Sequence, residues 1–147
     1  MADISLTGFD KLEAAFDGYV RGYEKMAKAA IEAAVPILVS KEKQALSTAI
    51  ANHPRKGERL STGSLVGSVE PTEVKKNDLG YYSVARPTGR NAHGTRNGAI
   101  AAYLEYGTPK MAPSPWRESC KNLAENDCVK AMEEEIDRCI EESFGYD

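Results

Sequence analysis

Apolar residues in the first third of the chain recur at steps of three or four positions, which predicts one long amphipathic helix. The residues of this apolar face are Phe9, Leu12, Phe16, Tyr19, Val20, Tyr23, Met26, Ala30, Ile31 and Ala34. Pro36 interrupts the pattern, because proline removes an amide donor and clashes with the preceding turn. We expect a kinked helix that continues to about Ala51, in preference to a second helix that starts at Pro36.

The start of this helix and its aromatic residues allow two further predictions. Thr7 and Asp10 are each followed three positions later by an acidic residue, so either can act as the N-cap. Phe16, Tyr19 and Tyr23 form an aromatic stripe at helical spacing, which is more typical of a buried core than of a cofactor site.

The middle of the chain predicts a loop and a small antiparallel sheet. The segment 53–59 is polar and contains proline and glycine, so we expect a solvated loop; the alternative is phosphate contact through Arg55, Lys56 and Arg59. Residues 65–69 and 79–85 are rich in strand-favouring side chains and flank a turn at 75–78, so they predict a hairpin. A lone hairpin is marginal in water, so it must pack on the helices or join a larger sheet.

The segment 86–98 contains three glycines, three arginines (Arg86, Arg90 and Arg96), one histidine and no acidic residue. It offers little apolar surface to bury, so we predict a flexible basic loop. The functional alternative is an arm that becomes ordered against DNA or against an acidic surface of a partner.

Residues 99–106 carry apolar side chains at helical spacing and predict a short helix, ended by Gly107 as a left-handed C-cap. The segment 108–113 holds two prolines and predicts a turn. Ser114 and Pro115 then fit the N-cap and the first position of a last helix that runs to about Ser143.

The last helix has an apolar face and an acidic face. Its predicted buried residues are Trp116, Cys120, Leu123, Ala124, Cys128, Ala131, Met132, Ile136, Cys139, Ile140 and Phe144. Its opposite face includes Glu133, Glu134, Glu135, Glu141 and Glu142. The acidic face is either a solvated surface or a surface for a basic partner, such as the arginine loop of a neighbouring copy.

Composition narrows these expectations to one soluble α+β domain that covers residues 1–147. The net charge of −3 argues against dedicated nucleic-acid binding. Cys120, Cys128 and Cys139 form no CxxC motif, so we expect buried free thiols in a reducing compartment. No apolar run reaches the roughly 18 residues of a membrane span, and the N-terminus does not resemble a secretion signal.

The sequence predicts no catalytic, metal or cofactor site. The two histidines, His53 and His93, lie in predicted loops without cysteine or carboxylate companions at ligand spacing. The chain contains no nucleophile elbow, phosphate-binding loop or dinucleotide glycine motif. We therefore expect a protein that is not an enzyme and that carries no cofactor.

Three phrases in sequence order carry a family resemblance: Thr62-Gly-Ser-Leu-Val-Gly-Ser68, Ala102-Tyr-Leu-Glu-Tyr-Gly-Thr108 and Ala112-Pro-Ser-Pro-Trp-Arg117. Together they resemble the tail-component (neck and tail-completion) proteins of long-tailed phages. The order of predicted elements fits this family along nearly the whole chain. Trp116 stands where phenylalanine is commoner in the family, and the long arginine loop is a second departure.

The resemblance implies a structural role at the head–tail junction of a virion, reached by assembly in the cytoplasm of the host. It implies contacts with other neck and tail proteins (a connector, a head-closure protein, a tail terminator or the tail tube) and a homo-oligomer in the particle. The residues that the resemblance marks are Tyr103, Glu105, Tyr106, Gly107, Thr108, Pro113, Pro115, Trp116 and Arg117. We expect most of them to shape a turn, and Glu105 to brace it by accepting hydrogen bonds from backbone amides.

Two alternatives stay open. Within the same assembly, the chain could instead be a tail terminator or a head-closure protein. A more remote alternative is an accessory protein that contacts DNA through the arginines of the loop, Arg86, Arg90 and Arg96, together with the cations of segment 53–59.

Overall fold

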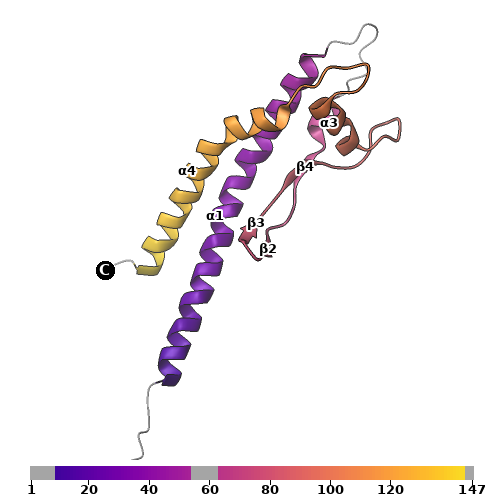
Figure 1. The fold of residues 1–147 in the computed structure, drawn as a ribbon. Helices are drawn as coiled ribbons and strands as arrows, with labels where there is room; N and C mark the ends of the chain where they lie inside the picture. The colour runs from indigo at the N-terminus through magenta and orange to yellow at the C-terminus, as the bar shows by residue number, and fades with distance from the viewer. Residues whose placement is uncertain (1–8, 54–62, 145–147) are drawn as a thin grey trace, which may run out of the picture.

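The computed structural model describes residues 9–53 and 63–144 and has the predicted α+β class (Figure 1). Its elements are α1 (Phe9–Ala51), α2 (Ser64–Gly67), β1 (Val69–Pro71), β2 (Lys75–Asn77), β3 (Gly80–Tyr82), β4 (Ala85–Pro87), α3 (Asn97–Tyr106) and α4 (Trp116–Phe144). The proposed cap at Thr7 and the cations of segment 53–59, from Arg55 onwards, lie outside the described residues.

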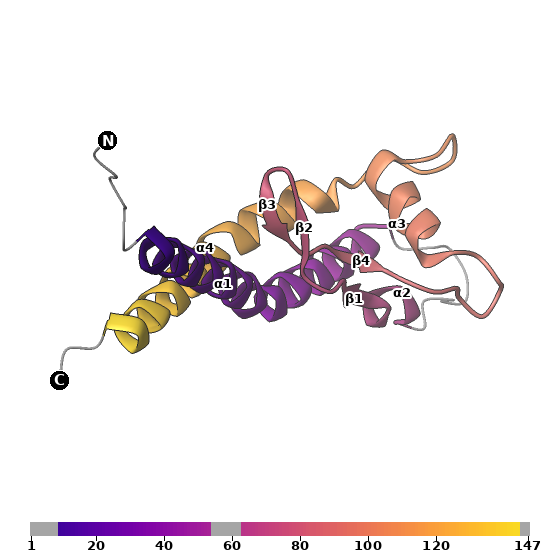
Figure 2. The same cartoon turned by 90° about the horizontal axis from the view of Figure 1, so that it is seen from below.

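The two long helices α1 and α4 run antiparallel and form the body of the molecule (Figures 1 and 2). Ala34 of α1 is buried, and its carbonyl oxygen accepts the Cys128 thiol of α4 at 3.7 Å, so a small side chain lies where the two helices meet. Asp127 of α4 pairs with Lys41 at 3.1 Å (Nζ to Oδ2). Helix α1 continues through Pro36 without a break, so a second helix starting at that proline is excluded.

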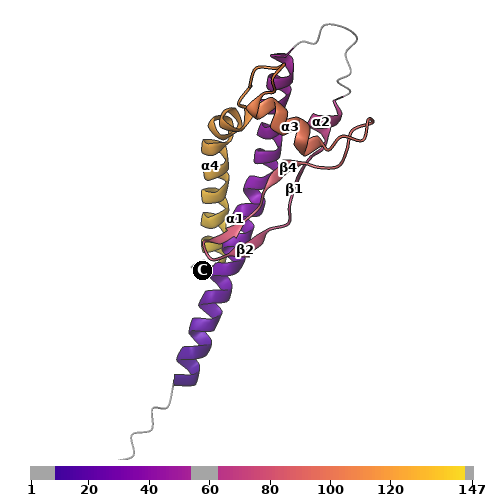
Figure 3. The same cartoon turned by 45° about the vertical axis from the view of Figure 1, so that its right-hand side comes forward.

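The prediction that the aromatic stripe of α1 belongs to the core is wrong. Phe16, Tyr19 and Tyr23 are 62%, 71% and 59% exposed. The physical reason is length: α1 has 43 residues and α4 has 29, so the N-terminal part of α1 extends beyond the end of α4 (Figures 1 and 3). A helical period reports an apolar face, but it does not report whether the chain supplies a partner for that face.

The strands form a long ribbon that is interrupted once. β1 pairs antiparallel with β4, and β2 pairs antiparallel with β3, as two separate two-stranded sheets. Thr72 and Val84 bridge the interruption: the Thr72 amide donates to the Val84 carbonyl at 2.8 Å, and the Val84 amide donates to Thr72 Oγ1 at 3.0 Å. The ribbon lies against α1, which supplies the support that the hairpin needs.

The predicted positions of the strands and the turn need correction. Residues 64–67 form the helical turn α2, and the first strand begins at Val69. The predicted turn at 75–78 is mostly strand β2. The chain reverses after Asn77, whose Oδ1 accepts the Leu79 amide at 2.9 Å, and Gly80 takes a φ of 127°. A local side-chain hydrogen bond and a glycine therefore fix the turn, in place of the lysine-rich segment.

The basic segment 86–98 is less irregular than the sequence suggests. It begins in β4 and ends in α3, which starts at Asn97 and not at residue 99. Between them, Asn91 Oδ1 accepts the amides of His93 at 3.0 Å and Thr95 at 2.9 Å. Flexibility of this loop stays a prediction.

One buried cluster joins α1, α2, β1, α3 and the start of α4. Its residues are Ala45, Leu46, Ala49, Leu65, Val69, Ala101, Leu104, Trp116 and Cys120. The predicted apolar face of α4 points toward α1, with Cys120 buried and Cys128 and Cys139 half-buried as free thiols. Leu123 and Ile140 are exceptions and remain exposed.

Candidate functional site: the braced corner between α3 and α4

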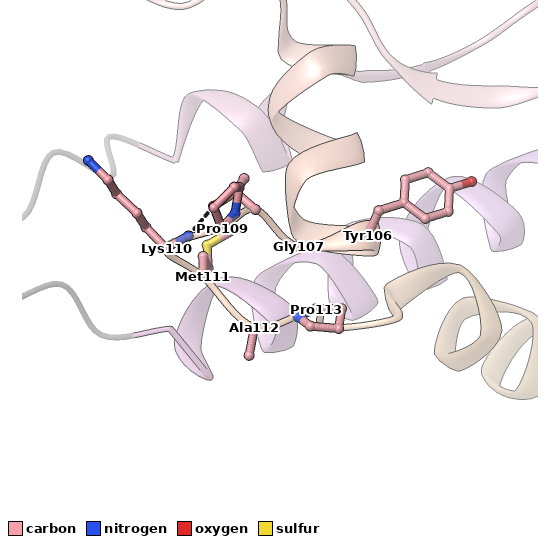
Figure 4. A pocket seen from close by; sticks show the side chains of 8 residues that line it. Tyr106, Gly107, Pro109, Lys110, Met111, Ala112 and Pro113 are labelled. Carbon is pink, nitrogen blue, oxygen red and sulfur yellow. Dashed lines mark hydrogen bonds between the residues drawn. The ribbon is translucent and has the colours of Figure 1, made fainter.

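The segment that carries most of the family phrase forms a corner between α3 and α4. Residues 106–113 surround a shallow, open hollow of about 570 Å³. Figure 4 shows these side chains along the loop that follows α3. We call this segment, together with its contacts to Glu105 and Arg117, the braced corner.

Gly107 ends α3 in a conformation that only glycine adopts readily. Its φ is 76° and its ψ is 179°, and its amide donates to the Tyr103 carbonyl at 2.9 Å. This confirms the predicted helix stop, but the ψ value lies outside the left-handed helical region that the sequence suggested. A Cβ on residue 107 would also lie 2.8 Å from the Met111 carbonyl oxygen and 2.9 Å from the Pro113 nitrogen.

The turn that follows is closed by reciprocal backbone hydrogen bonds. The Thr108 amide donates to the Met111 carbonyl at 2.8 Å, and the Met111 amide donates to the Thr108 carbonyl at 3.0 Å. The Ser114 amide then donates to the Leu104 carbonyl at 2.7 Å, which ties the chain after the turn back to α3. These bonds fix the direction in which the chain enters α4.

Glu105 braces the corner, but the amide that it binds belongs to the start of α4 and not to the turn, as the sequence had suggested. Its Oε2 accepts the backbone amide of Arg117 at 3.0 Å. The first amides of a helix lack partners within the helix, and a negative charge there also interacts favourably with the helix dipole. The predicted N-cap at Ser114 needs correction, because α4 begins at Trp116 and a carboxylate from α3 caps its first turn.

Trp116 and Arg117 join the corner to the core and to the surface. Trp116 is 5% exposed, and its Nε1 donates to the Ala101 carbonyl at 2.9 Å. The Arg117 guanidinium lies 5.4 Å from the centroid of the Trp116 ring and 6.0 Å from that of the Tyr106 ring. It also donates to the Tyr106 hydroxyl at 3.3 Å, so two aromatic rings hold this exposed cation in place.

A buried carboxyl group behind the corner was missed in the sequence. Glu42 of α1 is 4% exposed, and its Oε1 has no hydrogen-bond partner among the described residues. Burial raises the pKa of this carboxyl, while the positive charge of Arg117 acts in the opposite direction. The sequence did indicate the burial of Glu42, because position 42 lies four residues from both Leu38 and Leu46 and therefore on the apolar face of α1.

The three arginines of the basic loop do not form one patch. Arg86 lies opposite Glu70 in the β1–β4 pairing, whereas Arg90 and Arg96 lie opposite each other in an antiparallel bridge. The Arg90 guanidinium also donates to the Gly94 carbonyl at 2.6 Å. Figure 2 shows this loop and the braced corner at opposite ends of α3, so the loop and the corner are separate surfaces.

The acidic face of α4 is partly neutralised by its own helix. Arg138 contacts the carboxylates of Glu135 and Glu142, and this pairing lowers the pKa of Glu135. Lys130 lies 3.9 Å from Glu134 (Nζ to Oε1). These pairs favour the simpler interpretation of a solvated face.

The described part of the chain holds no cluster of three or more potential metal ligands. None of its helices is both long and apolar enough to cross a membrane. Comparison with family models, with curated proteins and with solved structures gives no match for this chain. The structure therefore establishes only the fold class. The chain is an α+β protein built on an antiparallel helix pair, with a braced turn at one end.

Proposed function

We propose that this chain is a structural protein of a tailed-phage virion or prophage, and that it acts at the head–tail junction in tail completion or head–tail joining. The proposal starts from the three phrases that resemble the neck and tail-completion family. The structure adds one observation in its support, which concerns where these phrases meet.

Each phrase contributes one buried side chain to the same cluster. Leu65 comes from the first phrase, Leu104 from the second and Trp116 from the third. Because these residues are far apart in sequence, a shared core gives a physical reason for the phrases to occur together. The core holds the braced corner, and a rigid corner suits a protein whose task is to present a fixed surface to its neighbours in a particle.

Loss of the gene from the phage that carries it tests this proposal. Electron micrographs of lysates should show filled heads and tails that accumulate separately, and a plasmid copy of the gene should restore joined particles. Normal joined particles without the protein would refute the proposal. Tails of uncontrolled length would favour a tail terminator instead, and emptied heads would favour a head-closure protein.

A DNA contact is the second candidate, because Arg90 and Arg96 are held opposite each other. Like charges that face each other across a β-bridge are unfavourable unless an anion lies nearby. DNA binding that weakens steeply with salt, and that is lost in Arg90→Ser and Arg96→Ser but kept in Arg86→Ser, would support this candidate. Absence of binding at low salt would eliminate it.

A further inference from the structure

A carboxyl group lies buried behind the braced corner, and one of its oxygens has nothing to bind. Glu42 of α1 is 4% exposed, and its Oε1 has no hydrogen-bond partner among the residues that the structure describes. Leu38 and Leu46, one helical turn to either side of Glu42, pack in or against the buried cluster that contains Trp116 and Cys120. Glu42 therefore approaches the start of α4 from inside the protein.

Arg117 brings a positive charge to the same place, but its side chain is held on the surface. Its guanidinium lies over the rings of Trp116 and Tyr106 and donates to the Tyr106 hydroxyl at 3.3 Å, which is long for a hydrogen bond. Tyr106 is 71% exposed, so water competes for these contacts. None of the ion pairs within residues 9–53 and 63–144 includes Arg117.

We propose that Glu42 and Arg117 form a two-position switch: when Glu42 loses its proton, the Arg117 guanidinium leaves Tyr106 and pairs with the Glu42 carboxylate inside the corner. The observed position of the guanidinium, on the two rings, suits a neutral Glu42. A buried charge without a partner is far less favourable than a buried neutral carboxyl without one, so ionisation requires the cation to move inward. This inference does not depend on the proposed function.

The charges around Glu42 determine the direction of the switch. Burial raises the pKa of Glu42 above its ordinary value of 4.5, and the positive charge of Arg117 acts against this shift, so the two side chains already interact. Glu42 therefore ionises as the pH rises past 4.5, and the anion then attracts Arg117. The inward position reduces the cost of the buried charge without removing it, because Arg117 gives up its contacts with two rings.

The other charged and titratable groups around the pair leave it free to form. From α3, Glu105 binds the backbone amide of Arg117, which fixes the main chain there while the side chain moves. From α4, the Cys120 thiol has a pKa raised above its ordinary 9 by burial and by the charge of Glu42, so it stays protonated where Glu42 titrates. Lys41, the neighbour of Glu42 on α1, is engaged in its ion pair with α4.

The switch changes the surface that the braced corner presents. With Glu42 neutral, a cation stands on the surface beside Tyr106, at the edge of the hollow lined by residues 106–113. With Glu42 ionised, this cation is withdrawn and the Tyr106 ring is released. The same corner therefore offers a partner a cationic surface at low pH and a neutral aromatic surface at higher pH.

Nuclear magnetic resonance of the full-length chain tests the inference. Nuclear Overhauser effects between the Arg117 side chain and the Tyr106 ring should be present at pH 4 and lost at pH 8. Glu42→Gln should keep them at both pH values, because its amide has no proton to lose in this range. His53 and His93 also titrate between these values, but a change that they caused would persist in Glu42→Gln.

The pH midpoint of the change, followed by the chemical shifts of the ring at position 106, gives a second test. Tyr106→Phe removes the hydroxyl acceptor and weakens the outer position, so the midpoint should move to lower pH. Arg138→Gln is the control, because this exposed arginine pairs within α4 and should leave the midpoint unchanged. Overhauser effects that persist at pH 8 in the wild type, a loss that also occurs in Glu42→Gln, or a midpoint that Arg138→Gln moves as far as Tyr106→Phe would overturn the inference.

Discussion

Replacement of Gly107 by alanine is the sharpest test of the braced corner. Residue 107 has a φ of 76° and a ψ of 179°, a region that side chains other than glycine occupy at a cost of about 1–3 kcal/mol. The added Cβ would lie 2.8 Å from the Met111 carbonyl oxygen and 2.9 Å from the Pro113 nitrogen. Both contacts involve backbone atoms of the turn, so a side-chain rotation cannot relieve them.

We expect Gly107→Ala to lower the free energy of unfolding by about 2–3 kcal/mol. Urea denaturation followed by circular dichroism measures this change directly. Gly98→Ala is the matched control, because it lies in α3, has no positive φ, and its Cβ would meet only the Pro87 carbonyl oxygen at 3.8 Å. The control should be neutral or stabilised by up to about 1 kcal/mol. If the two variants lost equal stability, or if Gly107→Ala lost less than about 0.5 kcal/mol, the assigned role of Gly107 would be wrong.

Three further predictions concern the contacts around the corner. Glu42→Gln should stabilise the protein at pH 7 but not below pH 4.5, the ordinary pKa of the group. The folded protein binds the proton of the Glu42 carboxyl more tightly than the unfolded chain does, so wild-type stability falls as pH rises through the raised pKa. Equal urea midpoints for wild type and variant from pH 4 to 8 would contradict this prediction. Glu105→Gln should cost about 1 kcal/mol through the weaker cap on Arg117, and added salt should shrink the difference. Trp116→Phe should cost about 1–3 kcal/mol, because the hydrogen bond to the Ala101 carbonyl is lost and a small void is left; an unchanged thermal midpoint would show that this bond is dispensable.

Helix ends and the buried face of a helix could be predicted, because the residues that determine them lie within a few positions of each other. Gly107 stops a helix, and the apolar spacing of α4 selects the face that carries Cys120. Each of these features depends on backbone geometry that neighbouring residues determine. The sequence therefore located the corner, although Glu105 and not Ser114 caps the first turn of α4.

Features that depend on distant segments could not be predicted. The exposure of Tyr19 follows from where α4 ends, which the pattern of α1 does not contain. The separation of Arg86 from Arg90 and Arg96 follows from strand register, which places Glu70 opposite only the first of them. Glu42 is an exception, because its place on the apolar face of α1 can be read from the sequence; its burial was missed because a charged residue is rarely fully buried.

The position of Trp116 makes its fluorescence a probe of one part of the fold. This is the only tryptophan of the chain, and it belongs to the buried cluster. It is the first residue of α4, and the start of α4 lies at the opposite end of the molecule from the extended part of α1 (Figure 1). Its fluorescence on denaturation therefore follows the docking of α4 on α3, whereas circular dichroism is dominated by the two long helices. If the N-terminal part of α1 frays separately, the two signals will change at different denaturant concentrations. A coincident transition would mean that the 43 residues of α1 unfold together with the corner.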